Sequence, residues 1–194
     1  MFVNTINRSA IARQLHGVAL ASSIALTLIG PSANATDNTG ASDSSLPLPS
    51  HLSASEGANT MSEILAARRY AAFWNTGNQQ YAHEALAEDF MDRTLPSGRP
   101  QGTAGPLQAS NTFRAAVPDL TADIDDMVVA SDRVSVHLHF KGHFSGHFGT
   151  TNGKGQVIDF QAFDLYRIVN GRIAENWHLE DNLTLLQQME VVGK

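Results

Sequence analysis

The sequence predicts an α+β domain in which an antiparallel sheet buries one face beneath a set of helices. Helical patterns occur between Thr60 and Pro118, and beyond Pro118 apolar and polar residues alternate at period two, which is typical of strands. The dipeptide Asn170-Gly171 separates two runs rich in Val, Ile, Phe and Tyr. This pattern is a strong signal for a β-hairpin over residues 156–181.

Residues 1–35 have the pattern of a secretory signal peptide. Arg8 and Arg13 precede an apolar run over 18–29, and the small-residue pattern Ala33-Asn34-Ala35 follows it. The run is shorter than the roughly 20 apolar residues that span a bilayer. We therefore expect cleavage after Ala35 and a periplasmic or secreted protein that has no membrane contact afterwards. An N-terminal membrane anchor is the alternative.

Residues 36–59 are rich in Ser, Asn, Gly and Pro and hold few large apolar side chains. Such a composition cannot bury enough surface to offset the entropy lost on ordering, so we expect a flexible linker. The remaining residues, 60–194, have the length of a single domain with one core.

The composition of the chain argues against several classes of partner and cofactor. The signal peptide carries two arginines and no acidic residue, so its cleavage would change the net charge from −6 to −8. Nucleic acids and anionic membranes require clustered Lys and Arg, so we expect neither as a partner. The sequence has no cysteine, which excludes disulfides and thiolate metal sites. It also has no phosphate-binding glycine loop or nucleotide fingerprint, so we expect no cofactor.

Three helices are predicted before the sheet. The capping box Thr60-Met61-Ser62-Glu63 starts the first helix, which ends at Gly77. The second covers 79–86. The third covers 106–117, places Phe113 on an apolar stripe and is stopped by the following proline.

The rest of the domain is predicted to consist mainly of strands. Alternation at period two indicates strands over 121–130 and 133–141, a short piece over 143–150 and then the hairpin. The leucine-rich segment 183–189 indicates a short C-terminal helix or tail.

The register of the hairpin decides which side chains share a face, because a slip of one residue moves a strand's side chains to the other face. A two-residue loop sets Asp164 opposite Trp177, whereas a three-residue loop with a bulge at Gly171 pairs Ile168 with Arg172. We favour the second register, because it separates an apolar face from a mixed one. The apolar face comprises Phe163, Leu165, Ile173, Trp177 and Leu179. The mixed face comprises Phe160, Ala162, Asp164, Tyr166, Ala174, Asn176, His178 and Glu180.

Several motifs occur in an order that resembles a known family. They are FRAAVP at 113–118, DLTADIDDMVVASDRV at 119–134, GHFSGHF at 142–148 and YRIVNGRIAENWHLEDNLTLLQQME at 166–190. Together they resemble the SnoaL-like polyketide cyclases of the nuclear transport factor 2-like superfamily, over about residues 62–191. The resemblance implies a cone-shaped, strongly curved sheet that closes with the N-terminal helices around an apolar cavity. It also implies a homodimer through the convex face of the sheet, where Phe163, Leu165 and Trp177 would lie.

Asp164 and His178 are the leading catalytic candidates. The unperturbed pKa of histidine is about 6.5, and a neighbouring carboxylate fixes its tautomer and supports its charged form. The SnoaL-like cyclases use an aspartate directly after the motif tryptophan, with a histidine on the neighbouring strand. Here His178 follows Trp177, so the resemblance implies the same couple with exchanged positions. An ordinary cross-strand polar pair is the alternative.

Further side chains are candidates for the site. The resemblance matches Asp181 to the family's motif acid, so we expect either a second catalytic carboxylate or the N-cap of the following helix. Asn176 and His143 are expected to donate to a developing enolate oxygen. The resemblance implies that His143 lines the cavity. The other candidate ligand contacts are His139, Phe160, Tyr166 and Phe113.

The histidines at 137, 139, 143 and 147 raise the alternative of a metal site. His137 and His139 share one face of a strand, as in the HxH pattern of the cupins. No acidic residue follows within this segment and its glycines leave the later register open, so we expect no metal there.

These patterns predict an exported domain that binds a small apolar or carbonyl-containing molecule. If it is an enzyme, we expect cofactor-free proton abstraction next to a carbonyl, with His178 as the base and Asp164 orienting it. Aldol cyclisation, isomerisation and hydration share this step. The alternatives are a binding module without chemistry, which export favours, and a metal-dependent histidine enzyme.

Overall fold

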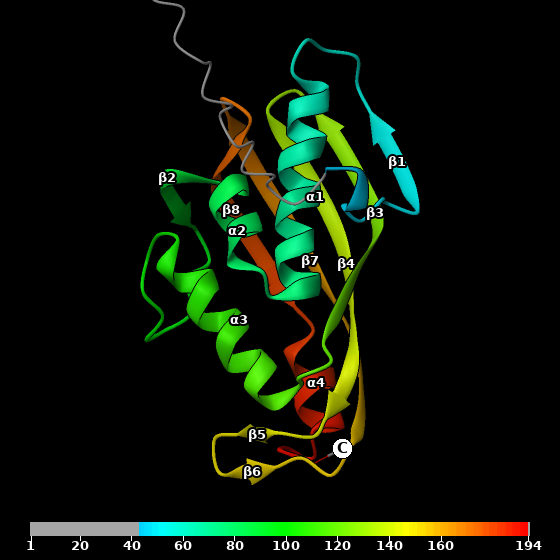
Figure 1. Ribbon diagram of the computed structural model, residues 1–194, viewed down its shortest axis with the longest axis vertical. Helices are drawn as coiled ribbons and strands as arrows, with labels where there is room; N and C mark the ends of the chain where they lie inside the picture. The colour runs from blue at the N-terminus through cyan, green and yellow to red at the C-terminus, as the bar shows by residue number, and fades with distance from the viewer. Residues whose placement is uncertain (1–42, 194) are drawn as a thin grey trace, which may run out of the picture. The chain divides into compact units, whose positions relative to one another are not determined.

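The computed structural model describes residues 43–193, so the predicted signal peptide and the first part of the predicted linker lie outside the described residues. A curved six-stranded sheet has the strand order β1-β3-β4-β7-β8-β2, with helices packed on one face (Figure 1). The central pairs, β3 with β4, β4 with β7 and β7 with β8, are antiparallel as predicted. The two edge strands, β1 and β2, pair in parallel. The α+β fold class is therefore confirmed.

The elements have the following bounds in the described range. The main sheet contains β1 (His51–Ala54), β2 (Leu86–Asp92), β3 (Thr121–Ala130), β4 (Arg133–Phe144), β7 (Gln156–Val169) and β8 (Arg172–Glu180). A small second sheet contains β5 (His147–Phe148) and β6 (Thr151–Asn152). The helices are η1 (Asp43–Ser45), α1 (Thr60–Thr76), α2 (Gln79–Ala85), α3 (Ala104–Ala116) and α4 (Asn182–Gln188).

Helix α1 lies where the sequence predicts it, but the capping box is not formed. Asn59 occupies the N-cap position, and the Thr60 hydroxyl donates instead to the carbonyl oxygen of Ser55 at 2.9 Å. The helix ends at Gly77, whose φ of 73° lies in the left-handed region and whose N–H donates to the Phe73 carbonyl. Glycine adopts this conformation without steric cost, which explains the stop.

Residues 43–59 contain ordered structure that their composition does not predict. Strand β1 pairs in parallel with β3, and Leu46 is only 3% exposed. The guanidinium group of Arg68 on α1 donates to the carbonyl oxygens of Leu46 and Pro47, both at 2.8 Å. These contacts extend the folded unit before the predicted boundary at residue 60.

The hairpin turns differently from the prediction, although most side chains reach the expected face. Asn170 and Gly171 both have positive φ, 50° and 71°, as a two-residue type I′ turn requires. The pairing shifts between Arg167 and Ile168, so that Asp164 lies opposite His178 farther along the strands. The bulge is therefore in β8 and not at Gly171. One consequence is that Ile173, expected on the apolar outer face, is fully buried.

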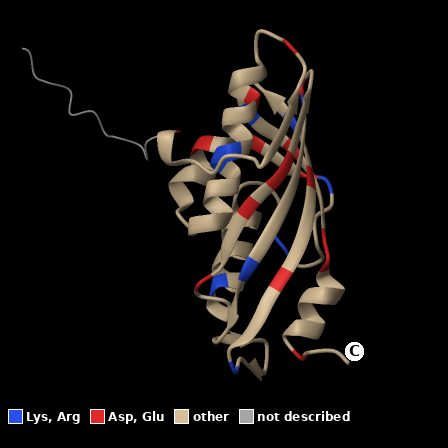
Figure 2. Ribbon diagram, turned by 90° about the vertical axis from the view of Figure 1, so that its right-hand side faces the viewer, with Lys and Arg blue, Asp and Glu red and all other residues tan. Residues whose placement is uncertain are grey.

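The inner face of the sheet supplies most of the core. Alternate residues of β4 and β7 are buried beneath the helices, including Val134, Leu138, Ile158, Phe160 and Tyr166. Acidic positions spread along strands of the exposed face (Figure 2). In the described residues, no helix combines the length and apolar character needed to cross a membrane.

Candidate functional site

A cavity of about 500 Å³ lies between the inner face of the sheet and helices α1, α3 and α4. Aromatic side chains form much of its wall, and Phe160 stacks on Phe140 with ring centroids 5.0 Å apart. Phe113 meets the Phe160 ring edge-on, with ring centroids 5.7 Å apart. The wall also includes Tyr70, Trp74, Phe90, Leu138 and Phe148. Such a cavity suits a ligand with a flat apolar body.

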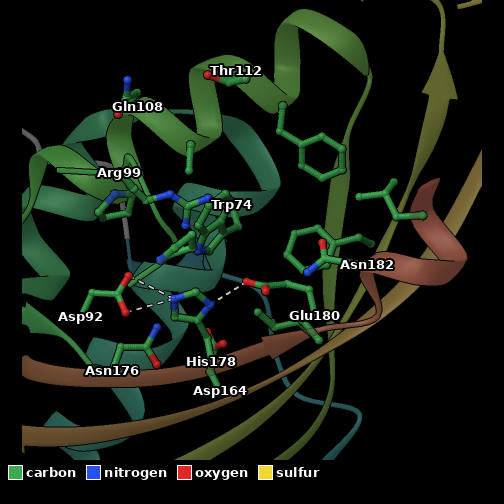
Figure 3. A pocket seen from close by; sticks show the side chains of 18 of the residues that line it. Trp74, Asp92, Arg99, Gln108, Thr112, Asp164, Asn176, His178, Glu180 and Asn182 are labelled. Carbon is green, nitrogen blue, oxygen red and sulfur yellow. Dashed lines mark hydrogen bonds and ion pairs between the residues drawn. The ribbon is translucent and has the colours of Figure 1, made fainter. Parts of the chain in front are cut away.

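Polar side chains converge on His178 at one end of this cavity (Figure 3). Its Nε2 lies 3.0 and 3.1 Å from the two carboxylate oxygens of Asp92, and its Nδ1 lies 2.7 Å from Glu180 Oε1. Both nitrogens face carboxylates, so the arrangement favours a ring that carries both protons. Burial lowers the pKa of His178, but the hydrogen bonds and charges of Glu180 and Asp92 outweigh burial and raise it to about 9.

Asp164 is the cross-strand neighbour of His178 and lines the same cavity. It is 6% exposed, and the Tyr166 hydroxyl donates to its Oδ2 at 2.7 Å. Burial raises the pKa of Asp164 to about 7, although the Tyr166 hydrogen bond and the His178 charge act in the opposite direction. The carboxyl group therefore gains or loses a proton much nearer to neutral pH than an ordinary aspartate does.

Strand β2 brings Asp92 to the site from 86 positions earlier in the sequence than His178. The parallel pairing of β2 with β8 sets Asp92 beside Asn176. The Asp92 carboxylate accepts the N–H of Thr94 at 2.9 Å, and Gln101 bonds to both the N–H and the carbonyl of Asp92. The Thr94 hydroxyl in turn accepts the N–H of His178 at 2.9 Å. This network fixes the orientation of the aspartate relative to the imidazole ring.

The sequence does not reveal Asp92 as a partner of His178. The two residues are 86 positions apart, and alternation beyond Pro118 gives no sign of a strand at 86–92. Glu180, in contrast, belongs to the predicted mixed face. It lies two residues from His178 on the same strand, and this spacing could have identified it as a partner of His178.

Other predicted site residues fall into two groups. Asn176, Phe160 and Phe113 line the cavity. The amide oxygen of Asn176 is buried without a hydrogen-bond partner among the described residues. Tyr166 is fully buried and contacts Asp164 instead of forming part of the cavity wall.

Three predicted residues lie away from the cavity: Asp181 takes the predicted N-cap role, and the structure corrects the assignment of His143 and His139. Asp181 caps α4, since its carboxylate accepts the N–H and the hydroxyl of Thr184 at 3.1 and 2.7 Å. His143 and His139 lie on the exposed side of β4, where they bond to Asp119 at 2.7 Å and to Asp159 at 2.6 Å. Neither histidine is placed to contact a ligand in the cavity.

The histidines of β4 do not converge. His137 stacks on Phe163 with ring centroids 4.2 Å apart, and His139 and His143 each bond to a different aspartate. Within residues 43–193, no three His, Asp or Glu side chains form a group that could hold a metal ion.

Comparisons with known proteins agree with one another. The family model described as SnoaL-like polyketide cyclase matches residues 64–189. A candidate polyketide cyclase from Bacillus cereus ATCC 10987 is 36% identical, with a TM-score of 0.70 and coverage of 77% of this chain and 96% of the other. IdmH from Streptomyces antibioticus, also described as a candidate polyketide cyclase, is 26% identical, with a TM-score of 0.57 over 64% and 98% of the two chains.

A third solved structure shares the fold at lower identity. TsrD from Streptomyces laurentii is 22% identical, with a TM-score of 0.62 and coverage of 68% of this chain and 97% of the other. A search of curated proteins gave no match.

Proposed function

Since the chain belongs to the SnoaL-like polyketide cyclase family, we propose that its cavity binds a carbonyl compound with an apolar body and catalyses proton transfer without a cofactor. The observation that carries this proposal is the juxtaposition of Asp164 and His178. They are cross-strand neighbours in one cavity, with pKa values of about 7 and 9. Two titratable groups with such different environments are typical of an acid-base couple.

The geometry favours Asp164 as the base, which reverses the roles that the sequence suggested. Both nitrogens of His178 are bonded to carboxylates, so the ring has no free lone pair that could accept a proton. Asp164 has a raised pKa and lines the cavity. Its carboxylate removes a proton from the carbon next to the substrate carbonyl, and the same group returns the proton later.

The negative charge that develops on the carbonyl oxygen needs donors and nearby positive charge. Asn176 lines the cavity beside Asp92 and supplies amide N–H groups. The protonated His178 ring, held between Asp92 and Glu180, offsets the negative charge of one of these carboxylates, so less negative charge opposes the enolate. The amide N–H groups of Asn176 bind an enolate oxygen more strongly than a neutral carbonyl, which is the condition for catalysis.

Aldol cyclisation, isomerisation and hydration share this enolate step. The flat aromatic wall and the descriptions of the relatives from Bacillus cereus and Streptomyces antibioticus support intramolecular aldol cyclisation as the first reaction to test.

Deuterium exchange at C1 of 2-tetralone, followed by ¹H NMR in D₂O, tests the enolate step without knowledge of the natural substrate. We expect the protein to accelerate exchange over buffer and Asp164→Asn to lower the protein-dependent rate about 100-fold or more. Arg133→Gln is the control, because this arginine lies outside the cavity, where it pairs with neighbouring Asp132 and lies over the Trp177 ring, 6.0 Å from its centroid. Exchange that equals buffer, or that survives Asp164→Asn, would contradict the proposal.

We further propose that the protein is exported and forms a homodimer through the outer face of β7 and β8. The exposed fractions of Phe163, Leu165 and Leu179, which are 54, 40 and 77%, support an apolar contact surface there. Light scattering should give twice the chain mass, and Phe163→Lys should reduce it to the monomer mass.

The proposed export is tested separately. Mass spectrometry of the mature protein should locate its N-terminus at Thr36.

A further inference from the structure

Arg99 lies in the loop between β2 and α3 and contributes to the wall of the cavity. Its side chain extends from this loop toward the region of Trp74 and His178 (Figure 3). The loop passes close to the start of α3: a Cβ on Gly105 would lie 2.5 Å from the Pro100 carbonyl oxygen and 3.5 Å from Arg99 Cγ. The absence of a side chain at Gly105 therefore allows the Pro100 carbonyl to approach the start of the helix, which holds the loop that carries Arg99 close to α3.

Arg99 differs from the other arginines of the described range in its hydrogen bonding. Every other arginine within 43–193 donates at least one side-chain hydrogen bond. The donors are Arg68, Arg69, Arg93, Arg114, Arg133, Arg167 and Arg172. In the same residues, the Arg99 guanidinium group has neither a hydrogen-bond acceptor nor an ion-pair partner, although it is only partly exposed.

The carboxylates of the cavity are already engaged by other groups. Asp92 and Glu180 hold His178, and Asp164 accepts the Tyr166 hydroxyl. A guanidinium group has five N–H donors in a planar fork that matches the two oxygens of a carboxylate. Arg99 thus presents N–H donors that form no hydrogen bond within the described residues to a cavity whose wall is partly aromatic, and its charge lowers the pKa of Glu180.

We propose that Arg99 binds a carboxylate group of the ligand, whose flat apolar body lies against the aromatic wall formed by Trp74, Phe113, Phe140 and Phe160. This inference rests on the proposed function only in taking the cavity as the ligand site. The substrate class is then an aromatic or polycyclic carboxylic acid that also carries a carbonyl group. The acid is held by Arg99 in the loop, and the reacting carbon lies toward Asp164 in the sheet.

Binding of two small probes separates the charge from the apolar body. The probes 2-naphthoate and 2-naphthamide have nearly the same shape, and only the first carries a negative charge. Isothermal titration calorimetry at pH 7.5 should show at least about tenfold tighter binding of 2-naphthoate by the unmodified protein, as expected for a hydrogen-bonded charge pair.

The variants identify the group responsible for this preference. Arg99→Gln should bind both probes equally, with an unchanged affinity for 2-naphthamide, and Arg99→Lys should retain part of the preference because it keeps the charge without the planar fork. Arg133→Gln removes the same charge outside the cavity and should retain the full preference. Circular dichroism should show all three variants folded, since Arg99 makes no side-chain hydrogen bond among the described residues and Arg133 pairs only with exposed Asp132 among their acidic side chains.

A preference that survives Arg99→Gln, equal binding of the two probes by the unmodified protein, or no binding of 2-naphthoate at millimolar concentration would overturn the inference. Neither probe reacts, so the result does not depend on catalysis. If 2-naphthoate binds through Arg99 while 2-tetralone shows no exchange above buffer, the carboxylate site stands and the proposed function fails. If 2-tetralone shows exchange above buffer while 2-naphthoate does not bind through Arg99, the proposed function stands and the carboxylate site fails.

Discussion

Histidine–carboxylate pairs occur on both faces of the sheet, and their surroundings differ. His178 on the inner face has a side chain that is 9% exposed, between Asp92 and Glu180. His143 on the outer face has a side chain that is 57% exposed, and it pairs with Asp119 at a similar distance of 2.7 Å. Short distances alone therefore do not identify a functional pair.

The different surroundings determine what each pair can do. On the inner face, the two carboxylates overcome the effect of burial and raise the pKa of His178 to about 9, while burial raises the pKa of nearby Asp164 to about 7. On the outer face, hydrogen bonds from His143 lower the pKa of Asp119, whose charge water can already stabilise. Only the inner groups line a cavity that can hold a ligand.

Replacing the two histidines should separate the faces most clearly. His178→Gln leaves Asp92 and Glu180 without their shared cation in a poorly solvated place, and should reduce the free energy of unfolding by about 3 kcal/mol. His143→Gln breaks an exposed pair and should cost less than about 1 kcal/mol. Urea unfolding at pH 6 measures both values, and equal losses for the two variants would contradict the comparison.

Stability should fall as the pH rises from about 6.5 to 9. The raised pKa of His178 means that its stabilising contribution is complete below its ordinary pKa of 6.5 and is lost as the pH rises through about 9. Asp164 acts in the same direction at lower pH, because the cost of ionising it in the folded protein grows as the pH rises from its ordinary pKa of 3.8 to about 7. Thermal unfolding across this range tests the sign.

Removing one carboxylate should show how the inner pair sets the charge of the ring. Asp92→Asn leaves Glu180 as the remaining charged partner of His178, so the pKa of His178 should fall by about 1 unit or more. Titration of the ring by NMR measures this shift. A pKa that remains near 9 would mean that Glu180 alone supports the charged form.

The smallest expected effect concerns the support of Asp164. Tyr166→Phe removes the hydroxyl that donates to its carboxylate, so the pKa of Asp164 should rise further, and the free energy of unfolding should fall by about 1 kcal/mol. Carboxyl ¹³C NMR follows the titration, with His143→Gln as the control for general effects of substitution. A lowered pKa would show that the hydroxyl does not stabilise the ionised form.

Much of the fold follows from periodicity, and the inner site follows only in part. Alternation correctly placed Asp164, Asn176 and His178 on one face of the hairpin, although a bulge in β8 and not at Gly171 produces this result. The same alternation could have corrected the placement of His139 in the cavity. Apolar Leu138 and Phe140 face the core, so His139 between them faces outward. For His143, the family resemblance was given more weight than the alternation, so this histidine was wrongly predicted to line the cavity.

Long-range pairings could not be predicted from local patterns. Asp92 reaches His178 only because β2 joins the sheet in parallel beside β8. Likewise, nothing local indicates that the serine-rich residues near Leu46 and Ser53 pack on the domain, since their partners are on α1 and β3. Both cases depend on contacts between segments that are far apart in the sequence.

The parallel pairing of β1 with β3 also bears on solubility. Ser50 and Ser55 extend this pairing with N–H groups that donate to the carbonyls of Ile124 and Val129, at 2.9 and 3.0 Å. A chain shortened to begin at Thr60 would lose this cover and expose the open edge of a long strand. Unpaired strand edges recruit other strands, and self-association of partly folded chains follows. We therefore expect the short segment before α1 to protect the domain against aggregation.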